Sequence, residues 1–411
     1  MPKLAIDGGS PVLPDGAGAR RFIGEEERVA ALRVLDRAIH RGGGFNRYGG
    51  EEVDAYEREF ASFVGTQHAT AVSSGTAALH AAVAALHLQP HTEVVCSPIT
   101  DPGAVMPVVM MQCIPVFADT YPWSFNASPE GVERVLSDRT GAVIVGHIAG
   151  EPADLDAIHD LAAARGVPVI EDAAQAHGAT YKGRMAGSLG TVSCFSMMSG
   201  KHHTSGGQGG MVLTDDEALC LEAKRFADRG KPFASEEASN LFLGLNYRMT
   251  ELAAAIGREQ LKKVPRFVAR RRALAERLFG LVAPLDAVHQ PEIQADTEPA
   301  YWFLRLRIDT EPLKVDKEQF ARALRAEGLP GSGTYTSIIY RQKWFAERNT
   351  FGVSGLPWSA ADRAYDYDGC CPNAEKALAD HMILAWPETY ADDVVDAFGE
   401  ALQKVESAYR R

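Results

Sequence analysis

The stretch Ala69–Leu88, ATAVSSGTAALHAAVAALHL, decides the fold class because it contains a strand, a turn and a helix in immediate succession. Its first residues, Ala69–Ser73, are small or apolar and lead into a Ser-Gly-Thr turn. The alanine-rich run after the turn has the composition of a helix. A strand that passes through a tight turn into a helix is the repeating unit of α/β proteins. The stretch therefore predicts one such unit.

The same alternation continues on both sides of this stretch. Apolar residues at helical spacing predict a helix at Glu51–Gly65, and residues 154–166 predict another. Short apolar segments bounded by Gly, Pro or Asp predict strands at Ala69–Ser73, Glu93–Ser97, Ile114–Ala118, Ala142–His147 and Val167–Glu171. Strands that alternate with helices imply an α/β fold, with a mostly parallel sheet flanked by helices.

A long helix is predicted to divide the chain. The helical pattern of Met249–Leu261 continues through the basic stretch Lys262–Arg272, which predicts one crossover helix. Residues 301–308 then predict a strand, and residues 317–328 and 391–409 predict helices. We therefore expect a large domain at residues 1–265, with an N-terminal arm at 1–25. The crossover helix and a small C-terminal α+β domain follow at 266–411.

Composition and charge exclude several classes of protein. The chain has 411 residues, 46% hydrophobic and 23% charged, which is typical of a globular protein. Its net charge of -12 argues against nucleic acid or an anionic membrane as a partner. The N-terminus lacks a basic stretch followed by a long apolar run, so we expect a cytoplasmic protein. Six cysteines without a CxxC pair favour buried free thiols over disulfides or a zinc site.

Two candidate binding elements lie at the ends of predicted strands. At Ser73–Leu79, the free amides of a first helical turn and the Thr76 hydroxyl could face a phosphate, although the turn alone also fits a simple helix N-cap. At Val169–His177, VIEDAAQAH, the acids lie where open α/β sheets bind ligands. Asp172 could keep a pyridinium N–H charged, and Gln175 could reach an oxygen on the same ring, or the acid could cap the next helix.

A third element supplies a nucleophile. The segment Phe195–Lys201, FSMMSGK, carries a lysine out of an apolar strand, where loss of water lowers the pKa of the amine. Ser196 could add a hydroxyl to a phosphate site, and the glycines of 206–210 allow close approach of the backbone. A lysine for a Schiff base, a carboxylate for a pyridine nitrogen and amides for a phosphate together predict a pyridoxal phosphate (PLP) site.

Two other features carry less weight. His202 and His203 raise the question of a metal, but adjacent side chains in an extended segment point apart and no further ligand is near, so no metal is expected. His177 is interpreted as structural. The glycine-rich stretch Gly42–Gly50 lacks GxGxxG spacing and is expected to be a loop that borders the site.

The ordered motifs resemble the DegT/StrS-type sugar aminotransferases, which are fold-type I PLP enzymes. The resemblance runs from about Gly44 to Pro387 and is carried by SSGTAALHAAV, EDAAQAHGA, FSMMSGK, GLNYRMTELAAAIGREQL and CPNAE. It implies a seven-stranded sheet in a large PLP-binding domain, and a homodimer with shared active sites.

The resemblance also implies roles for single residues. Lys201 would bond the cofactor and carry protons, and Asp172 would pair with the pyridine nitrogen. Gln175 would lie at the 3' oxygen, and Gly75, Thr76 and Ser196 would surround the phosphate. Asn246 matches a family asparagine that reaches the phosphate in the neighbouring subunit's site.

Three departures from the family pattern bear on this assignment. The loop KHHTSGGQGG is one residue longer than usual, and counting back from Gly209 would place His202 at the lysine position, as in the dehydratase branch. The ungapped run from Asp172 favours Lys201. Asp101 stands where an aromatic residue commonly stacks on the cofactor. The segment GTYTSIIYRQKWF lacks the histidine-tyrosine pattern of nucleotide-sugar enzymes.

The predicted function is amino transfer from glutamate or glutamine to a keto sugar, either nucleotide-linked or a keto-cyclitol, through Lys201. Two alternatives remain at this stage. One is a dehydratase that uses pyridoxamine phosphate and His202 as its base. The other is a regulatory protein that binds PLP without turnover.

Overall fold

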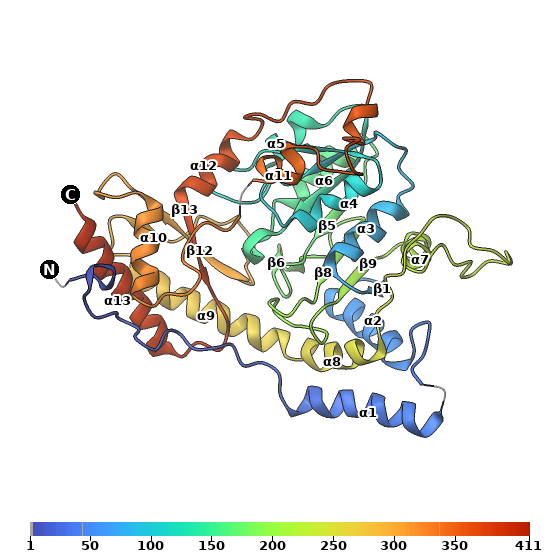
Figure 1. The fold of residues 1–411 in the computed structure, drawn as a ribbon, viewed down its shortest axis with the longest axis horizontal. Coiled ribbons are helices and arrows are strands. Elements are labelled where there is room, and N and C mark those ends of the chain that lie inside the picture. Colours follow the sequence, from blue (N-terminus) through green and yellow to red (C-terminus); the bar gives the residue numbers. More distant parts are fainter. Residues whose placement is uncertain (1–2, 43, 337) are drawn as a thin grey trace.

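A seven-stranded sheet forms the centre of the protein (Figure 1). The structure is a computed structural model that describes residues 3–42, 44–336 and 338–411. The strand order is β1-β9-β8-β5-β4-β2-β3, and only β9 runs antiparallel to its neighbours. The strands are β1 His68–Val72, β2 Glu93–Cys96, β3 Ile114–Phe117, β4 Thr140–Gly146, β5 Val169–Asp172, β8 Val192–Ser196 and β9 Gly210–Thr214. The expected mostly parallel, seven-stranded α/β sheet is confirmed.

Helices cover both faces of this sheet because its strands are apolar on both sides. Val94 packs against one helical layer and its neighbour Val95 packs against the other, as the alternation of a strand requires. One face is covered by α3 Gly75–Ala85, α4 Met106–Met110 and α7 Glu217–Phe226. The other is covered by α2 Glu51–Val64, α5 Pro129–Val135, α6 Leu155–Ala163 and α8 Glu251–Leu261. These two helical layers bury the ends of β1, β5 and β8, which lead into the candidate site residues.

The expectation of one continuous crossover helix is wrong. Helix α8 ends at Leu261, and a separate helix, α9, runs over Val264–Val282. Pro265 is the second residue of α9, and it has no N–H to donate to the carbonyl of the preceding turn. The chain therefore begins a new helix at this point.

A second, three-stranded sheet lies in the C-terminal part of the chain. Its order is β10-β12-β13, and all pairs are antiparallel. Its apolar face packs with α9, α10 and α13 in a separate hydrophobic core. The elements are β10 Val288–His289, β12 Phe303–Ile308, β13 His381–Ala385, α10 Lys317–Ala326 and α13 Asp392–Tyr409. A third small sheet joins β11 Thr297–Glu298, β6 Thr180–Tyr181 and β7 Arg184–Met185.

The segment between α10 and β13 crosses back to the large sheet. Its aromatic residues Tyr340, Phe345 and Tyr367 surround Phe117 of β3. It contains η4 Ile339–Arg341, α11 Lys343–Ala346, η5 Trp358–Ala360 and α12 Pro372–Asp380. The domain division at 265 and 266 stays a prediction, and this segment contacts the large sheet across it.

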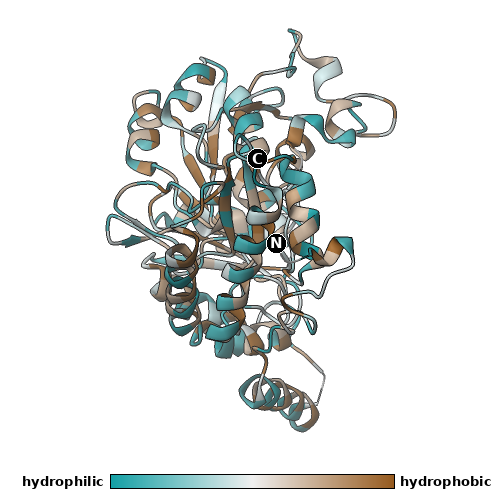
Figure 2. Ribbon diagram, turned by 90° about the vertical axis from the view of Figure 1, so that its left-hand side faces the viewer, coloured by the Kyte–Doolittle hydropathy of each residue, from teal (hydrophilic) through white to brown (hydrophobic). Residues whose placement is uncertain are grey.

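The N-terminal arm runs along the C-terminal part before α1, Glu25–Arg41, reaches α8. Helix α1 protrudes at the edge of the molecule and carries both hydrophilic and hydrophobic residues (Figure 2). Within the described residues, no helix combines the length and apolar character needed to cross a membrane. The six cysteines are free thiols, and five of them are buried.

Candidate active site

A pocket opens where β1, β5 and β8 end, and it collects most of the predicted site residues. Its lining includes Gly75 and Thr76 from the start of α3, Asp172 and Gln175 after β5, and Ser196 with Lys201 at and after β8. Other lining residues are Ser74, Leu79, Asp101, Gly103, Ala104, Ala174, Met198, Gln208 and Trp302. Six of the seven predicted residues therefore face one cavity.

The first turn of α3 forms one wall of the pocket. The Ser74 hydroxyl accepts a hydrogen bond from the Ala77 amide at 3.0 Å and so caps the helix. Gly75 permits close packing, because a Cβ at this position would lie 2.6 Å from Cβ of Ser196. The first amides of a helix have no partner within it, and the helix dipole favours an anion there. The turn and the Ser196 hydroxyl thus fit a phosphate group.

Only one of the two acids after β5 faces the pocket. Glu171 points away from the pocket. Its carboxylate lies 2.9 Å from Nε2 of His147 and accepts hydrogen bonds from the backbone amides of Gly187 and Leu189. Asp172 lines the pocket, and its Oδ1 accepts the Ala174 amide at 3.1 Å. Burial raises the pKa of Asp172, while the Ala174 amide and the Lys201 charge oppose that rise. A cationic ring nitrogen beside it would stabilise the carboxylate further.

Lys201 places its amine inside the pocket. Burial lowers the pKa of this amine to about 8, although the carboxylates of Asp172 and Asp101 act in the opposite direction. The Nζ atom lies 3.5 Å from the centre of the Trp302 ring. A lysine with this pKa has an appreciable neutral fraction near neutral pH, and only the neutral amine is a nucleophile.

His202 points away from the pocket. Its Nε2 lies 3.1 Å from the Ala300 carbonyl oxygen, which can only accept, so Nε2 carries the proton. The ring is fully buried beside His177, and burial lowers the pKa of His202 well below its usual value. His203 lies 2.9 Å from the Tyr56 hydroxyl instead. The described residues contain no group of three or more His, Cys, Asp or Glu placed to hold a metal.

The Gln175 carboxamide has a defined orientation. The Ala149 backbone amide donates to Oε1 at 2.8 Å, so the oxygen is fixed on that side and the NH2 group points the other way. That NH2 group donates to the Tyr335 hydroxyl at 2.8 Å. Among the described residues, the second N–H of this group has no partner, and a ring oxygen would need such a donor.

Sequence reasoning missed two aromatic residues of the site. Trp302 and Tyr335 come from the C-terminal part of the chain, far from the motifs around β1, β5 and β8. Neither belongs to a motif of its own, so no local signal could have identified them. Asp101 lines the pocket at the position where the family pattern has an aromatic residue.

Asn246 is exposed and lies outside this pocket. It lies in the loop between α7 and α8 and forms an isolated antiparallel β-bridge with Asp228. Its role at the phosphate of a neighbouring subunit stays a prediction.

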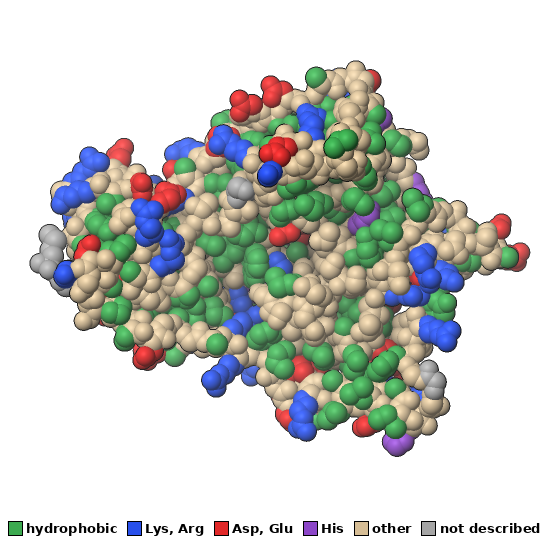
Figure 3. Space-filling model, viewed as in Figure 1, with side chains coloured by type: hydrophobic (Ala, Val, Ile, Leu, Met, Phe, Trp, Pro, Cys, Tyr) green, Lys and Arg blue, Asp and Glu red, His purple; other side chains and the backbone are tan. Residues whose placement is uncertain are grey.

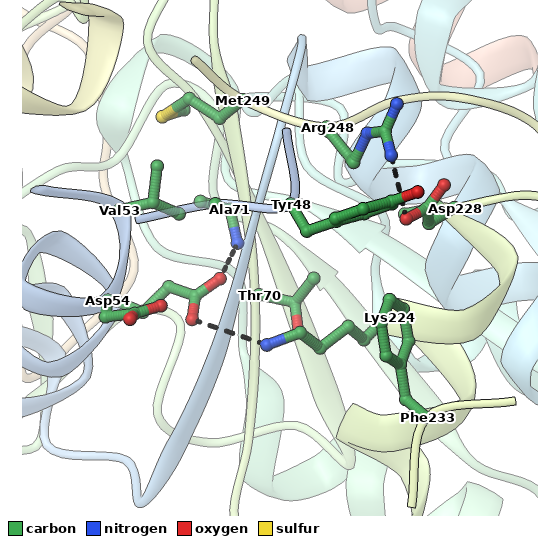
Figure 4. Close-up of a pocket in the computed structure, with 13 residues that line it drawn as sticks. Tyr48, Val53, Asp54, Thr70, Ala71, Lys224, Asp228, Phe233, Arg248 and Met249 are labelled. Atoms are coloured by element: carbon green, nitrogen blue, oxygen red, sulfur yellow. Dashed lines mark hydrogen bonds and ion pairs between the residues drawn. The ribbon is translucent and has the colours of Figure 1, made fainter. Parts of the chain in front are cut away.

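A second pocket lies next to Asn246, between α2, β1 and α7 (Figure 4). Arg248 pairs with Asp228 at 3.0 Å, and Lys224 lies 4.0 Å from the Glu57 carboxylate. Its charges are therefore largely paired with one another. The pocket at Lys201 offers an amine that forms no ion pair with any residue that the structure describes, and it is the stronger candidate.

Comparisons with known proteins point to the same chemistry. Residues 26–402 match the DegT/DnrJ/EryC1/StrS aminotransferase family. The chain is 30% identical over 369 residues to the spore coat polysaccharide biosynthesis protein SpsC of Bacillus subtilis, covering 87% of this chain and 90% of that protein. It is 35% identical over 262 residues to the GDP-perosamine synthase of Vibrio cholerae, covering 64% and 71%. The structure of S. venezuelae DesV with a ketimine intermediate superposes with a TM-score of 0.81 at 28% identity, covering 93% and 94%.

Proposed function

Because the chain belongs to the DegT/DnrJ/EryC1/StrS aminotransferase family, we propose that it transfers an amino group from glutamate or glutamine to a keto sugar or keto-cyclitol. It is a PLP-dependent aminotransferase. The names of two relatives, a polysaccharide biosynthesis protein and a GDP-perosamine synthase, support a sugar acceptor, including a nucleotide-linked one. The observation that carries the proposal is the buried Lys201 amine, held in one pocket with Asp172 and the first turn of α3.

Each site residue has a task that follows from its surroundings. When bound, PLP supplies an aldehyde that combines with amines and a ring that withdraws electrons. Lys201 can attack as a neutral amine and hold or release a proton at Nζ, because its lowered pKa lies near neutral pH. Asp172 would hold the ring nitrogen by its negative charge, and Gln175 would offer an N–H to the 3' oxygen. Gly75, Thr76 and Ser196 would hold the phosphate.

The dehydratase alternative receives less support from the geometry. It needs His202 as a base in the pocket, and the His202 ring is instead buried against Ala300 with a strongly lowered pKa. A regulatory protein without turnover would keep the cofactor site but would show no reaction with an amino donor. The cytoplasmic location stays a prediction of the sequence.

A homodimer with shared sites is part of the proposal. Exposed apolar side chains gather on α1 and in the loop before α8. Ile39 of α1 is 72% exposed, and Leu243 of the loop is 91% exposed. Hydrophobic side chains are visible over the α1 region in Figure 3. Surfaces of this kind are commonly covered by a partner. Asn246 lies in the same loop and would reach the partner's phosphate site, so light scattering of the purified protein should give twice the monomer mass.

The first test of the proposed function is absorption spectroscopy with two variants. The wild type with PLP should show a visible band that glutamate or glutamine removes, and borohydride should attach the cofactor to Lys201. The variant Lys201→Ala should lose the band and the attachment, whereas the matched variant His202→Asn should keep both. A wild type in which borohydride attaches nothing to Lys201, and which holds only pyridoxamine phosphate irrespective of Lys201, would support the dehydratase. A band that ignores every donor would support the regulatory protein.

A further inference from the structure

Trp302 stands in the pocket as a rigid aromatic wall. Its indole N–H donates to the Gly200 carbonyl at 2.7 Å, and its backbone amide donates to the Ala149 carbonyl at 2.8 Å. Its own carbonyl accepts from Arg271 at 3.0 Å. Hydrogen bonds at both ends of the residue fix the ring without any bond to the Lys201 side chain. The position of its face is therefore a property of the fold.

The Lys201 amine lies against that face. Its Nζ is 3.5 Å from the ring centre, well within the range of a cation–π contact. Among the described residues Nζ forms no ion pair, since Asp172 and Asp101 act on it only through their more distant charges. The indole is thus the nearest group that can stabilise a positive charge on this buried lysine.

An aminotransferase needs such a place for its lysine. In each half-reaction the incoming amine takes over the bond to the cofactor, so the lysine side chain is released and must later return. A long side chain released into an open pocket would lose its position, because four rotatable bonds carry it. A fixed aromatic face beside the attachment residue would keep the ammonium group close.

We propose that Trp302 is a positioning residue that receives the Lys201 ammonium group on its indole face whenever this lysine is not bonded to the cofactor. The inference rests on the proposed function, because it takes Lys201 as the lysine that bonds PLP. The inference concerns the chain's own residues, so the protonation of Lys201 in the cofactor-free protein can test it without enzyme turnover.

The test is a pH titration of Lys201 in the full-length, cofactor-free protein. Competitive labelling with acetic anhydride, read by mass spectrometry of the Lys201 peptide, gives the midpoint at which the amine loses its proton. Loss of the aromatic face in Trp302→Leu should lower this midpoint by about 1, because a buried cation–π contact contributes about 0.5–2 kcal/mol. Trp302→Phe keeps a weaker face and should fall between wild type and Trp302→Leu.

A matched variant controls for the loss of a large ring. Trp344 is also partly buried but packs against Phe345, away from the pocket, so Trp344→Leu should leave the midpoint unchanged. If Trp302 only filled space, its removal would admit water and the midpoint would rise toward that of a free lysine. An unchanged or raised midpoint in Trp302→Leu would overturn the inference. If that variant does not fold, a raised midpoint in Trp302→Phe would do so.

Borohydride labelling separates this inference from the proposed function. If PLP and borohydride label Lys201 in the wild type but the midpoint does not fall in Trp302→Leu, only the positioning role fails. If Lys201 is never labelled, the proposed function itself fails.

Discussion

Replacing Gly75 with alanine should weaken cofactor binding by a predictable amount. The added Cβ would lie 2.6 Å from Cβ and 3.1 Å from Oγ of Ser196, closer than carbon atoms pack. Overpacking of this kind costs about 1–3 kcal/mol. The first turn of α3 can relieve the clash only by moving away from β8, which opens the proposed phosphate site. We therefore expect Gly75→Ala to bind PLP roughly 5- to 150-fold more weakly.

A second substitution tests whether the clash is the cause. Ser196→Gly removes both clashing side-chain atoms and leaves Ser196 Cα at 3.2 Å from the new Cβ. In that background Gly75→Ala should cost much less affinity, which a double-mutant cycle measures as a coupling free energy. Gly280→Ala is the control, because a Cβ at this helical position meets no atom within 4 Å. The dissociation constants come from fluorescence titration with PLP. Equal losses in both backgrounds would refute the steric argument.

Three further predictions concern charge. The rate of PLP capture should rise about tenfold between pH 7 and pH 9, because the neutral fraction of Lys201 rises around its pKa of about 8; stopped-flow absorption would show a rise of about a hundredfold if the amine kept an ordinary lysine pKa of about 10.4, and no rise if it were unreactive. Removing the shared partner of the buried Arg271 and the partly buried Arg20 in Glu388→Ala should destabilise the fold by about 3–5 kcal/mol, since Arg271 would keep an unpaired buried charge; urea unfolding with an unchanged midpoint would contradict this. Burial lowers the pKa of His177 and His203, so the unfolded chain binds protons first and stability should fall as pH drops below about 6.5; thermal melts between pH 7.5 and 5 measure it, and a constant melting temperature would exclude it.

The part of the site built from local sequence was predictable. Each of the elements around Thr76, Asp172 and Ser196 is a strand followed by a turn, and the chemistry of the turn is contained in a few adjacent residues. Because these strands are parallel, the sheet brings their carboxyl ends to one edge, and no other sequence signal is needed to place them together. The choice of Lys201 over His202 also followed from counting along the strand, and the buried His202 ring agrees with it.

The remaining part depended on packing between distant segments. Pro265 is a signal that the crossover helix divides, since a proline inside a helical pattern removes a hydrogen bond. The apolar periodicity continues on both sides of this proline and therefore favoured a single helix. Trp302 and Tyr335 carry no local pattern, because their roles arise only where Trp302 meets the segment after β8 and Tyr335 meets the segment after β5. Contacts of this kind have no signature in a single sequence.

Segments from both ends of the chain stabilise the loop that carries Lys201. Arg20 of the N-terminal arm donates to the backbone carbonyls of Lys201 and His202, and its side chain also pairs with Glu388 after β13. Glu388 in turn pairs with Arg271 of α9, whose guanidinium donates to the carbonyl of Trp302. One largely buried network therefore fixes the backbone of Lys201 and the backbone of Trp302, whose ring the Lys201 amine contacts. Because both depend on Glu388, the Glu388→Ala variant should also lower the affinity for PLP, whereas loss of a surface ion pair such as Arg139–Asp362 should leave it unchanged.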